Sequence, residues 1–305
     1  MRAVVLALLF SLVTIPAIAS DGVLEINQTC AVQTGCFSGD VAGFPVTIST
    51  SGSYLLTSEL IVDQTITVIE ISTIDVTLDL GGFTIRGPAL KPIGGTCSVQ
   101  PGPGSGIRVP NAGTSGTIVR NGRVRGMPGN GVDLELSPNS VVEGVIAEQN
   151  CVDGIVVGLS GFVADSLARS NGFTGIRVAG YGRVRDSIAD SNSTGIYAPN
   201  SVVTGSVTSG NTTGINLSGA TPSSIGGGVV MGNVIASNVT VGVQTNGTSN
   251  TGGLIVNNQL TFNGVGATGA INSGVGGNVL YGNQVSSIGV TIDCNAIAGG
   301  ASCPP

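Results

Sequence analysis

The side chains able to do chemistry are concentrated between Arg108 and Asp190. The candidates for a catalytic or binding role in this stretch are Asp153, Asp165, Asp186, Asp190, Arg169, Arg177 and Arg185. From Ser191 to Pro305 the only charged side chain is Asp293, so an acid, a base or a metal site must lie before that stretch. The chain has no histidine and no Cys-x-x-Cys pair, which argues against a metal site built from those ligands.

These residues belong to a repeat that is most regular from Asn150 to Gly214. An asparagine, two or three residues and then Gly-Ile recur there about every 20 residues, and such a short period indicates a solenoid. Each coil of a solenoid buries its apolar face only against its neighbours. The glycine anchors are 19 to 28 residues apart and lie at Gly106, Gly131, Gly154, Gly175, Gly195, Gly214, Gly242, Gly266 and Gly289. Fixed anchors with variable spacing indicate β-strands joined by turns, not helical repeats.

Alignment of the coils gives columns of equivalent residues. One column suits left-handed turn conformations and comprises Gly144, Asp165, Asp186, Gly205, Gly232, Asn257 and Gly282. The next is expected to hydrogen-bond from coil to coil and comprises Val145, Ser166, Ser187, Ser206, Asn233, Asn258 and Asn283. A third is expected to stack as an inner asparagine ladder and comprises Asn150, Asn171, Asn192, Asn211, Asn238 and Asn263. The glycines that follow this ladder are expected to be turns.

Two segments carry a family resemblance. The run Gly-Asn-x-Ile-x-x-Asn-x-x-x-Gly-Val at Gly232–Val243 and the segment Leu-Asp-Leu-Gly-Gly-Phe-Thr-Ile at Leu78–Ile85 resemble β-helix repeats of the pectin-lyase-like superfamily. The resemblance extends from about Phe44 to Asp293. It implies an all-β fold, a single right-handed parallel β-helix of roughly ten coils of about 19–28 residues.

The resemblance also suggests chemistry. The superfamily includes polysaccharide lyases, polygalacturonases, epimerases, tailspikes and adhesins. Its polygalacturonase-like members use a histidine, which this chain lacks. Its lyase-like members bind calcium through clustered carboxylates and use an arginine or lysine as the base. Here that implies calcium at Asp165 and Asp186, whose separation of 21 residues stacks them on neighbouring coils.

A structural interpretation of the same residues is favoured. Asp165 and Asp186 fall in the turn column, where aspartate suits the backbone. Outward charges alternate from coil to coil, as in cross-strand ion pairs, along Arg125, Glu148, Arg169 and Asp190. The chain has no tryptophan, and its tyrosines form no stripe, although Tyr181 and Tyr197 lie near neighbouring coils. We therefore predict a non-catalytic protein that binds surfaces or glycans or has a structural role, with a calcium-dependent polysaccharide lyase as the alternative.

The ends of the chain indicate export. A basic start, an apolar run and Ala17-Ile-Ala19 predict a signal peptide over residues 1–19. A disulfide-pinned segment is expected over 20–43, the β-helix over 44–293 with a loop excursion at 88–105, and a disulfide-closed tail over 294–305. Six cysteines are compatible with disulfides, and proximity favours Cys30–Cys36 and Cys294–Cys303. That leaves Cys97 and Cys151 as a loop-to-coil bridge or two free thiols.

Charge limits the possible partners. The formal net charge is −6 and the isoelectric point about 4.5, so no basic face is expected for nucleic acid or anionic lipid. No membrane insertion is expected after signal cleavage, because no second apolar run follows. A polysaccharide or a cell-surface glycan is the expected partner. The expected location is secreted, periplasmic or at the cell surface, and the oligomeric state is not predicted.

Overall fold

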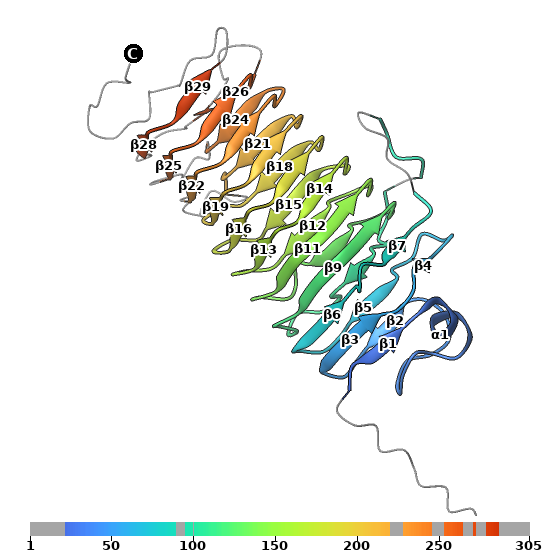
Figure 1. Ribbon diagram of the computed structural model, residues 1–305. Helices are drawn as coiled ribbons and strands as arrows, with labels where there is room; N and C mark the ends of the chain where they lie inside the picture. The colour runs from blue at the N-terminus through green and yellow to red at the C-terminus, as the bar shows by residue number, and fades with distance from the viewer. Residues whose placement is uncertain are drawn as a thin grey trace, which may run out of the picture.

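The computed structural model describes residues 22–89, 95–99, 101–219, 228–245, 253–264, 271–272 and 279–286. These residues form a single right-handed parallel β-helix, as the sequence predicted, whose coils stack along one axis with β1 and β29 near opposite ends (Figure 1). A 19-stranded sheet, sheet A, forms two rows that meet at a corner, and a ten-stranded sheet, sheet B, completes each coil. Sheet B has one strand per coil, which agrees with the roughly ten coils expected.

The strands are short because each side of a coil is short. The first row of sheet A comprises β1 (Leu24–Ile26), β3 (Gly52–Leu56), β6 (Val76–Asp79), β9 (Ile118–Arg125), β11 (Val141–Glu148), β13 (Phe162–Ala164), β16 (Arg183–Arg185), β19 (Val202–Thr204), β22 (Val229–Met231), β25 (Leu254–Val256) and β28 (Val279–Tyr281). The second row comprises β4 (Leu60–Ile61), β7 (Thr84–Arg86), the second halves of β9 and β11, β14 (Leu167–Arg169), β17 (Ile188–Asp190), β20 (Val207–Ser209), β23 (Val234–Ala236), β26 (Gln259–Thr261) and β29 (Gln284–Ser286). Sheet B comprises β2 (Val46–Ile48), β5 (Ile69–Ile71), β8 (Ile107–Arg108), β10 (Val132–Leu134), β12 (Ile155–Val157), β15 (Thr174–Val178), β18 (Thr194–Tyr197), β21 (Thr213–Asn216), β24 (Val241–Gln244) and β27 (Ile271–Asn272).

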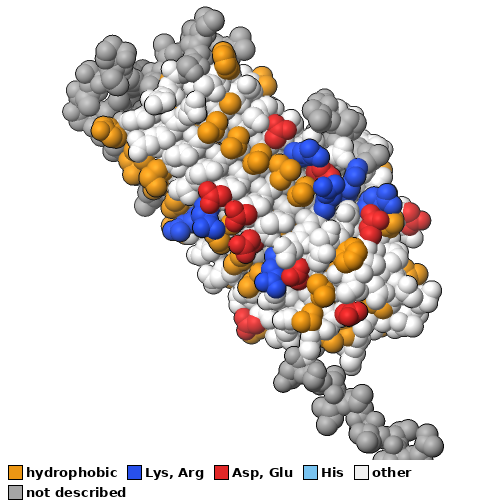
Figure 2. All heavy atoms as spheres, viewed as in Figure 1, with side chains coloured by type: hydrophobic (Ala, Val, Ile, Leu, Met, Phe, Trp, Pro, Cys, Tyr) orange, Lys and Arg blue, Asp and Glu red, His pale blue; other side chains and the backbone are white. Residues whose placement is uncertain are grey.

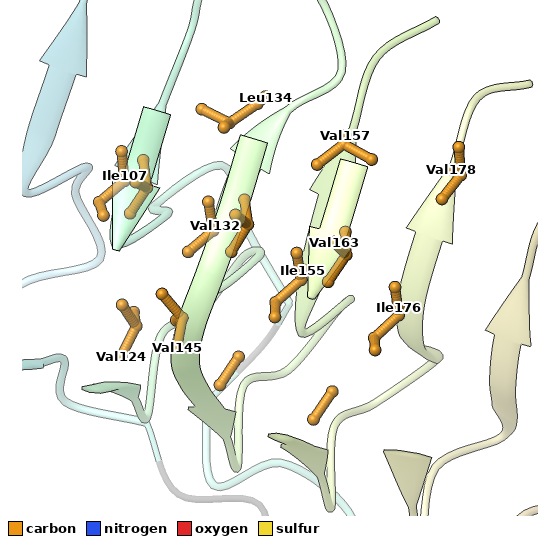
Figure 3. Close-up of a cluster of buried hydrophobic side chains, with 14 of the residues drawn as sticks. Ile107, Val124, Val132, Leu134, Val145, Ile155, Val157, Val163, Ile176 and Val178 are labelled. Carbon is orange, nitrogen blue, oxygen red and sulfur yellow. The ribbon is translucent and has the colours of Figure 1, made fainter. Parts of the chain in front are cut away.

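The core is a stack of aliphatic side chains inside the coils. Strand side chains alternate between the two faces of a sheet, so the middle residue of a three-residue strand in sheet A points inward. Val142, Val163 and Val184 pair in register and are fully buried. On the facing sheet B, Val132, Ile155 and Ile176 stack from coil to coil (Figure 3). Each coil thus closes its core only by contact with the next coil.

The corner between the two rows of sheet A is a single left-handed residue. Asp165 and Asp186 both have φ of 49°, and Gly144 has φ of 62°, which confirms the predicted turn column. The corner turns the chain sharply, so residues before it face a different side of the molecule from residues after it. A second left-handed corner, which the sequence analysis did not identify, follows the second row at residues such as Ser170 and Ser191.

The asparagine ladder is confirmed, but its glycines are not turns. The ladder amides donate from coil to coil over 2.8 to 3.2 Å, and the chain of bonds runs Asn150, Asn171, Asn192, Asn211, Asn238 and Asn263. Gly175 and Gly195 lie inside strands of sheet B without a positive φ, which corrects the expectation. A Cβ at Gly175 would lie 2.7 Å from the Asn192 Nδ2 atom, so glycine is required by the close approach of the ladder.

Two disulfides tie less regular segments to the β-helix. The first coil is preceded by β1 and a short helix, α1 (Gln28–Gln33), and Cys30 of that helix bonds Cys36 as expected. Cys97, in the described part of the loop excursion, bonds Cys151, so the loop-to-coil bridge is the correct alternative. Cys294 and Cys303 lie outside the described residues. No helix in the described part of the chain is long and apolar enough to cross a membrane.

Candidate functional site

Three of the predicted site residues meet on the outer face of the first row of sheet A. The Arg185 Nε atom lies 3.3 Å from Asp186 Oδ2, and its Nη2 atom lies 3.6 Å from Asp165 Oδ2. The two aspartates occupy the corner on successive coils, and about half of each side chain is exposed. One guanidinium therefore bridges a stacked pair of carboxylates and offsets part of their charge.

Aromatic side chains flank this charged group. The guanidinium carbon of Arg185 lies 5.6 Å from the centroid of the Phe162 ring, within the range of a cation–π contact. A hollow of about 410 Å³ lies beside Phe162 and is lined by Ser160, Gly161, Phe162, Tyr181, Gly182, Arg183 and Val202. Tyr181 sits on a turn with φ of 55° and is 71% exposed, so its ring is available at the edge of the hollow. Gly161 and Gly182 are required by close packing toward the interior, because a Cβ at Gly161 would lie 2.7 Å from the Val157 Cβ atom and one at Gly182 would lie 2.6 Å from the Val178 Cγ1 atom.

Arg183 supplies the positive charge that lines this hollow. It is exposed, and it pairs in register with Phe162 on one neighbouring strand and Val202 on the other. Neither neighbour carries a charge, and within the described residues no carboxylate forms an ion pair with Arg183. A free guanidinium beside two aromatic rings can bind a carboxylate through paired hydrogen bonds while the rings cover an apolar face. We call Phe162, Tyr181, Arg183 and Arg185 the aromatic–arginine site.

Asp153 and Arg177 lie elsewhere, on the sheet B side of the coils. The Asp153 Oδ1 atom accepts a hydrogen bond from the Thr174 amide at 2.8 Å, and its Oδ2 atom lies 3.1 Å from Arg177 Nε. The contact between Arg177 Nε and Asp153 Oδ2 is an ion pair, but its geometry does not make a hydrogen bond. The Arg177 side chain extends across Val156, and its two terminal nitrogens each donate a hydrogen bond to the Glu135 carboxylate. Burial raises the pKa of the Asp153 carboxyl, despite the opposing effects of the Thr174 amide and the Arg177 charge.

Asp190 and Arg169 lie on the second row of sheet A. Arg169 forms a 2.7 Å ion pair with Glu148, whose carboxylate is almost fully buried. Asp190 accepts hydrogen bonds from Ser209 at 2.8 Å and from Ser191 at 3.1 Å. The predicted register of this outward column is confirmed, but among its neighbouring opposite charges only Glu148 and Arg169 form an ion pair in the described part of the chain. Glu148 binds Arg123, whereas Arg125 donates to Gln149.

The four aspartates therefore do not share one groove. Asp165 and Asp186 lie together, Asp153 lies on the sheet B side, and Asp190 lies on the second row of sheet A. Within the described residues, no group of three His, Cys, Asp or Glu side chains is arranged to hold a metal ion. Tyr181, Phe162 and Arg183 were not predicted from the sequence to form one group. The signal was present in the column that places Phe162 directly beside Arg183.

The comparisons with known proteins agree with the fold. The family described as "Periplasmic copper-binding protein (NosD)" matches residues 103–296. A search of the curated proteins finds no match. The chain resembles the Dettilon tailspike protein with a TM-score of 0.56 and 13% identity, over 82% of this chain and 54% of the tailspike. The chain thus spans about half of the tailspike's length.

A second similar structure is the pectate lyase Pel9A, with a TM-score of 0.52 and 12% identity, over 92% of this chain and 83% of the lyase. At these identities the likeness shows the fold alone. The two disulfides fit a location outside the cytoplasm. Because the family match covers more than half of the chain, this protein belongs to the NosD family of periplasmic β-helix proteins.

Proposed function

We propose that this protein is a non-catalytic β-helix that binds an acidic glycan at the aromatic–arginine site. The observation that carries the proposal is the free guanidinium of Arg183 in a hollow of about 410 Å³ between Phe162 and Tyr181. Sugar rings bury their apolar faces against aromatic rings, and a uronate carboxylate matches the paired donors of a guanidinium. The hollow offers both kinds of contact within one coil spacing.

The same site is poorly suited to catalysis. Arg185 is always protonated, and two carboxylates bind it, so it has no lone pair with which to remove a proton. Calcium takes six to eight oxygen ligands, whereas Asp165 and Asp186 supply two carboxylates that already bind Arg185. The stacked aspartates are nevertheless the feature that a calcium-dependent polysaccharide lyase would use, and this alternative is tested below.

Copper, which the family description names, does not fit the described residues. Copper is bound in proteins by imidazole, thiolate and thioether ligands. The chain has no histidine, and the four described cysteines are all in disulfides. Met127 is fully buried in the core, while Met231 is exposed on the outer face of sheet A. The proposed function therefore assigns no role to copper at the aromatic–arginine site.

The binding experiment compares two matched tyrosines. We expect an acidic oligouronate to bind in isothermal titration calorimetry, and a neutral oligosaccharide of equal length not to bind. Tyr181→Ala and Arg183→Gln are each expected to weaken binding by about tenfold or more, since each removes one principal contact. Tyr281→Ala is the control, because Tyr281 is equally exposed at 73% but lies on β28, far along the axis. Equal weakening by Tyr181→Ala and Tyr281→Ala would overturn the assignment of the site.

The lyase alternative is tested by product formation. The protein is incubated with an acidic polysaccharide, with and without calcium, and release of unsaturated uronide is followed by absorbance. We expect no release in either condition. Calcium-dependent release that is lost in Asp186→Ala would show that the protein is a lyase and would defeat the non-catalytic proposal.

A further inference from the structure

Four arginines gather on the second row of sheet A, outside the aromatic–arginine site. They are Arg86 on β7, Arg123 and Arg125 on β9, and Arg169 on β14. We call this group the arginine cluster. Figure 2 shows basic side chains gathered on one part of the outer face with acidic side chains among them, whereas the part toward the C-terminal end is nearly free of charge.

The cluster places like charges directly opposite each other. Arg86 and Arg125 are register partners on adjacent strands. Like charges at such positions destabilise a sheet unless an opposite charge lies between them. The carboxylate nearest to Arg86 is Glu59, at 3.6 Å, which lies on the side away from Arg125 in the strand order. Arg125 itself donates to the neutral Gln149 and forms no ion pair within the described residues.

The carboxylates around the cluster do not balance its charge. Glu148 is shared between Arg123 at 3.3 Å and Arg169 at 2.7 Å. Asp190 neighbours Arg169 in register, but its two oxygens accept hydrogen bonds from serines. Among the described residues, two carboxylates therefore form ion pairs with three of these guanidiniums, and the fourth guanidinium has none. This excess of positive charge occurs in a chain whose formal net charge is −6.

A hollow adjoins the cluster at the corner of sheet A. It has a volume of about 370 Å³ and is lined by Gly82, Thr84, Asn121, Gly122, Arg123, Gly144 and Ile146. A Cβ at Gly82 would meet no atom within 4 Å, so glycine there leaves the hollow open, whereas Gly122 is required by the interior, where a Cβ would lie 2.3 Å from the Leu80 Cβ atom. The result is an open floor with Arg123 at its edge and Arg125 two residues further along the same strand. A small ring in the hollow would have guanidiniums beside it.

We propose that the arginine cluster and its hollow bind the phosphate monoester of a sugar. A phosphate monoester carries a charge close to −2 and three acceptor oxygens, so it can bridge Arg86, Arg123 and Arg125. Guanidinium forks match phosphate oxygens with paired hydrogen bonds. The bound phosphate supplies the negative charge missing between Arg86 and Arg125. This site is separate from the aromatic–arginine site and does not depend on the glycan proposed there.

The test measures binding and melting with two named probes. Inorganic phosphate and a hexose phosphate are titrated by calorimetry, and melting temperature is recorded against chloride at matched ionic strength. We expect both phosphates to bind and to raise the melting temperature, and the hexose phosphate to bind at least as tightly. Arg125→Gln is expected to weaken binding by about tenfold or more. Arg120→Gln is the control and keeps full binding, because Arg120 pairs with Asp79 at 2.9 Å on the first row of sheet A and belongs to neither proposed site.

Arg86→Gln provides a second, independent variant, because Arg86 is half-exposed and its removal relieves the repulsion with Arg125. It should melt no lower than the wild type in chloride and should lose the stabilisation by phosphate. The proposal is wrong if phosphate gives no more stabilisation than chloride does. It is equally wrong if Arg125→Gln and Arg86→Gln, both folded, bind phosphate as the wild type does.

Discussion

The buried asparagines are the residues that hold neighbouring coils in register. Asn171 is fully buried; its Oδ1 atom accepts from both the amide and the side chain of Asn150, and its Nδ2 atom donates to the Ala147 carbonyl and to Asn192. Both polar atoms of its side chain are satisfied inside the β-helix. Loss of the Asn171 side chain therefore leaves the buried backbone amide of Asn150 without its acceptor and removes one hydrogen bond from each neighbouring asparagine side chain.

Asn171→Ala should destabilise the protein by about 3 kcal/mol, because it leaves buried donors and an acceptor unpaired. The free energy of unfolding is measured by urea denaturation. Thr204→Ala, on the outward face of β19, is the control and should change that free energy by less than about 0.5 kcal/mol. A loss in Asn171→Ala no greater than in the control would show that the ladder does not hold the coils.

Asp153 shows how burial can outweigh an ion pair. Only 6% of this residue is exposed, and desolvation is the largest influence on its carboxyl. The Thr174 amide and Arg177 act in the opposite direction and do not fully compensate, so the pKa lies above the ordinary value of 3.8. At pH values between 3.8 and the raised pKa, Asp153 is consequently more protonated in the folded state than in the unfolded state.

This difference predicts a pH dependence of stability with a definite sign. Between pH 3.8 and the raised pKa of Asp153, the folded state binds more protons than the unfolded state. The free energy of unfolding therefore falls as the pH rises through this interval. Asp153→Asn keeps an oxygen for the Thr174 amide and removes the titration. The melting temperature of the wild type, relative to that of Asp153→Asn, should therefore decrease over that pH interval and then level off. A relative melting temperature that rises over the interval would contradict the assignment.

At the scale of elements, the loop excursion is fixed to the coils by a long-range disulfide. Cys97 and Cys151 are 54 residues apart, whereas Cys30 and Cys36 are separated by six. The end of the loop is also held by hydrogen bonds between Gly102 and Pro128 and between Gly104 and Gly129. The chain-entropy cost of an open loop grows with its length, so the two disulfides differ in their expected contributions.

The double variant Cys97→Ser/Cys151→Ser should be less stable than the wild type by about 4 kcal/mol, as calculated from the length of the loop that the disulfide closes. The matched pair Cys30→Ser with Cys36→Ser should cost about 2 kcal/mol. Thermal unfolding of both double variants gives the order of the two effects. If the Cys30 and Cys36 variant melts lower than the other, loop length does not determine the contribution of these disulfides.

At the scale of the whole molecule, both proposed sites lie on sheet A in the half of the β-helix that carries the charges. This division was visible in the sequence, because Asp293 is the only charged residue after Asp190. The repeat also allowed the fold, the turn column and the asparagine ladder to be predicted. Stacking imposes a fixed pattern of glycine, asparagine and aliphatic residues on every coil, and that pattern is local in the sequence.

The grouping of charges could not be predicted in the same way. Asp186 and Asp190 are four residues apart, but the left-handed corner at Asp186 places them on different rows of sheet A. Arginine side chains are longer than the spacing between coils, about 4.8 Å, so their partners are not fixed by register. Arg177 thus reaches two coils away to Glu135, and Arg123 binds Glu148 in place of Arg125.

The central claim is that this β-helix holds an acidic glycan intact. Native mass spectrometry of the protein with an oligouronate, in the presence of calcium, reports binding and cleavage in one measurement. We expect a complex whose mass equals that of the protein plus one full-length oligouronate, and we expect Arg183→Gln to reduce its abundance. Free protein alone, or a complex with shortened unsaturated fragments, would contradict the claim.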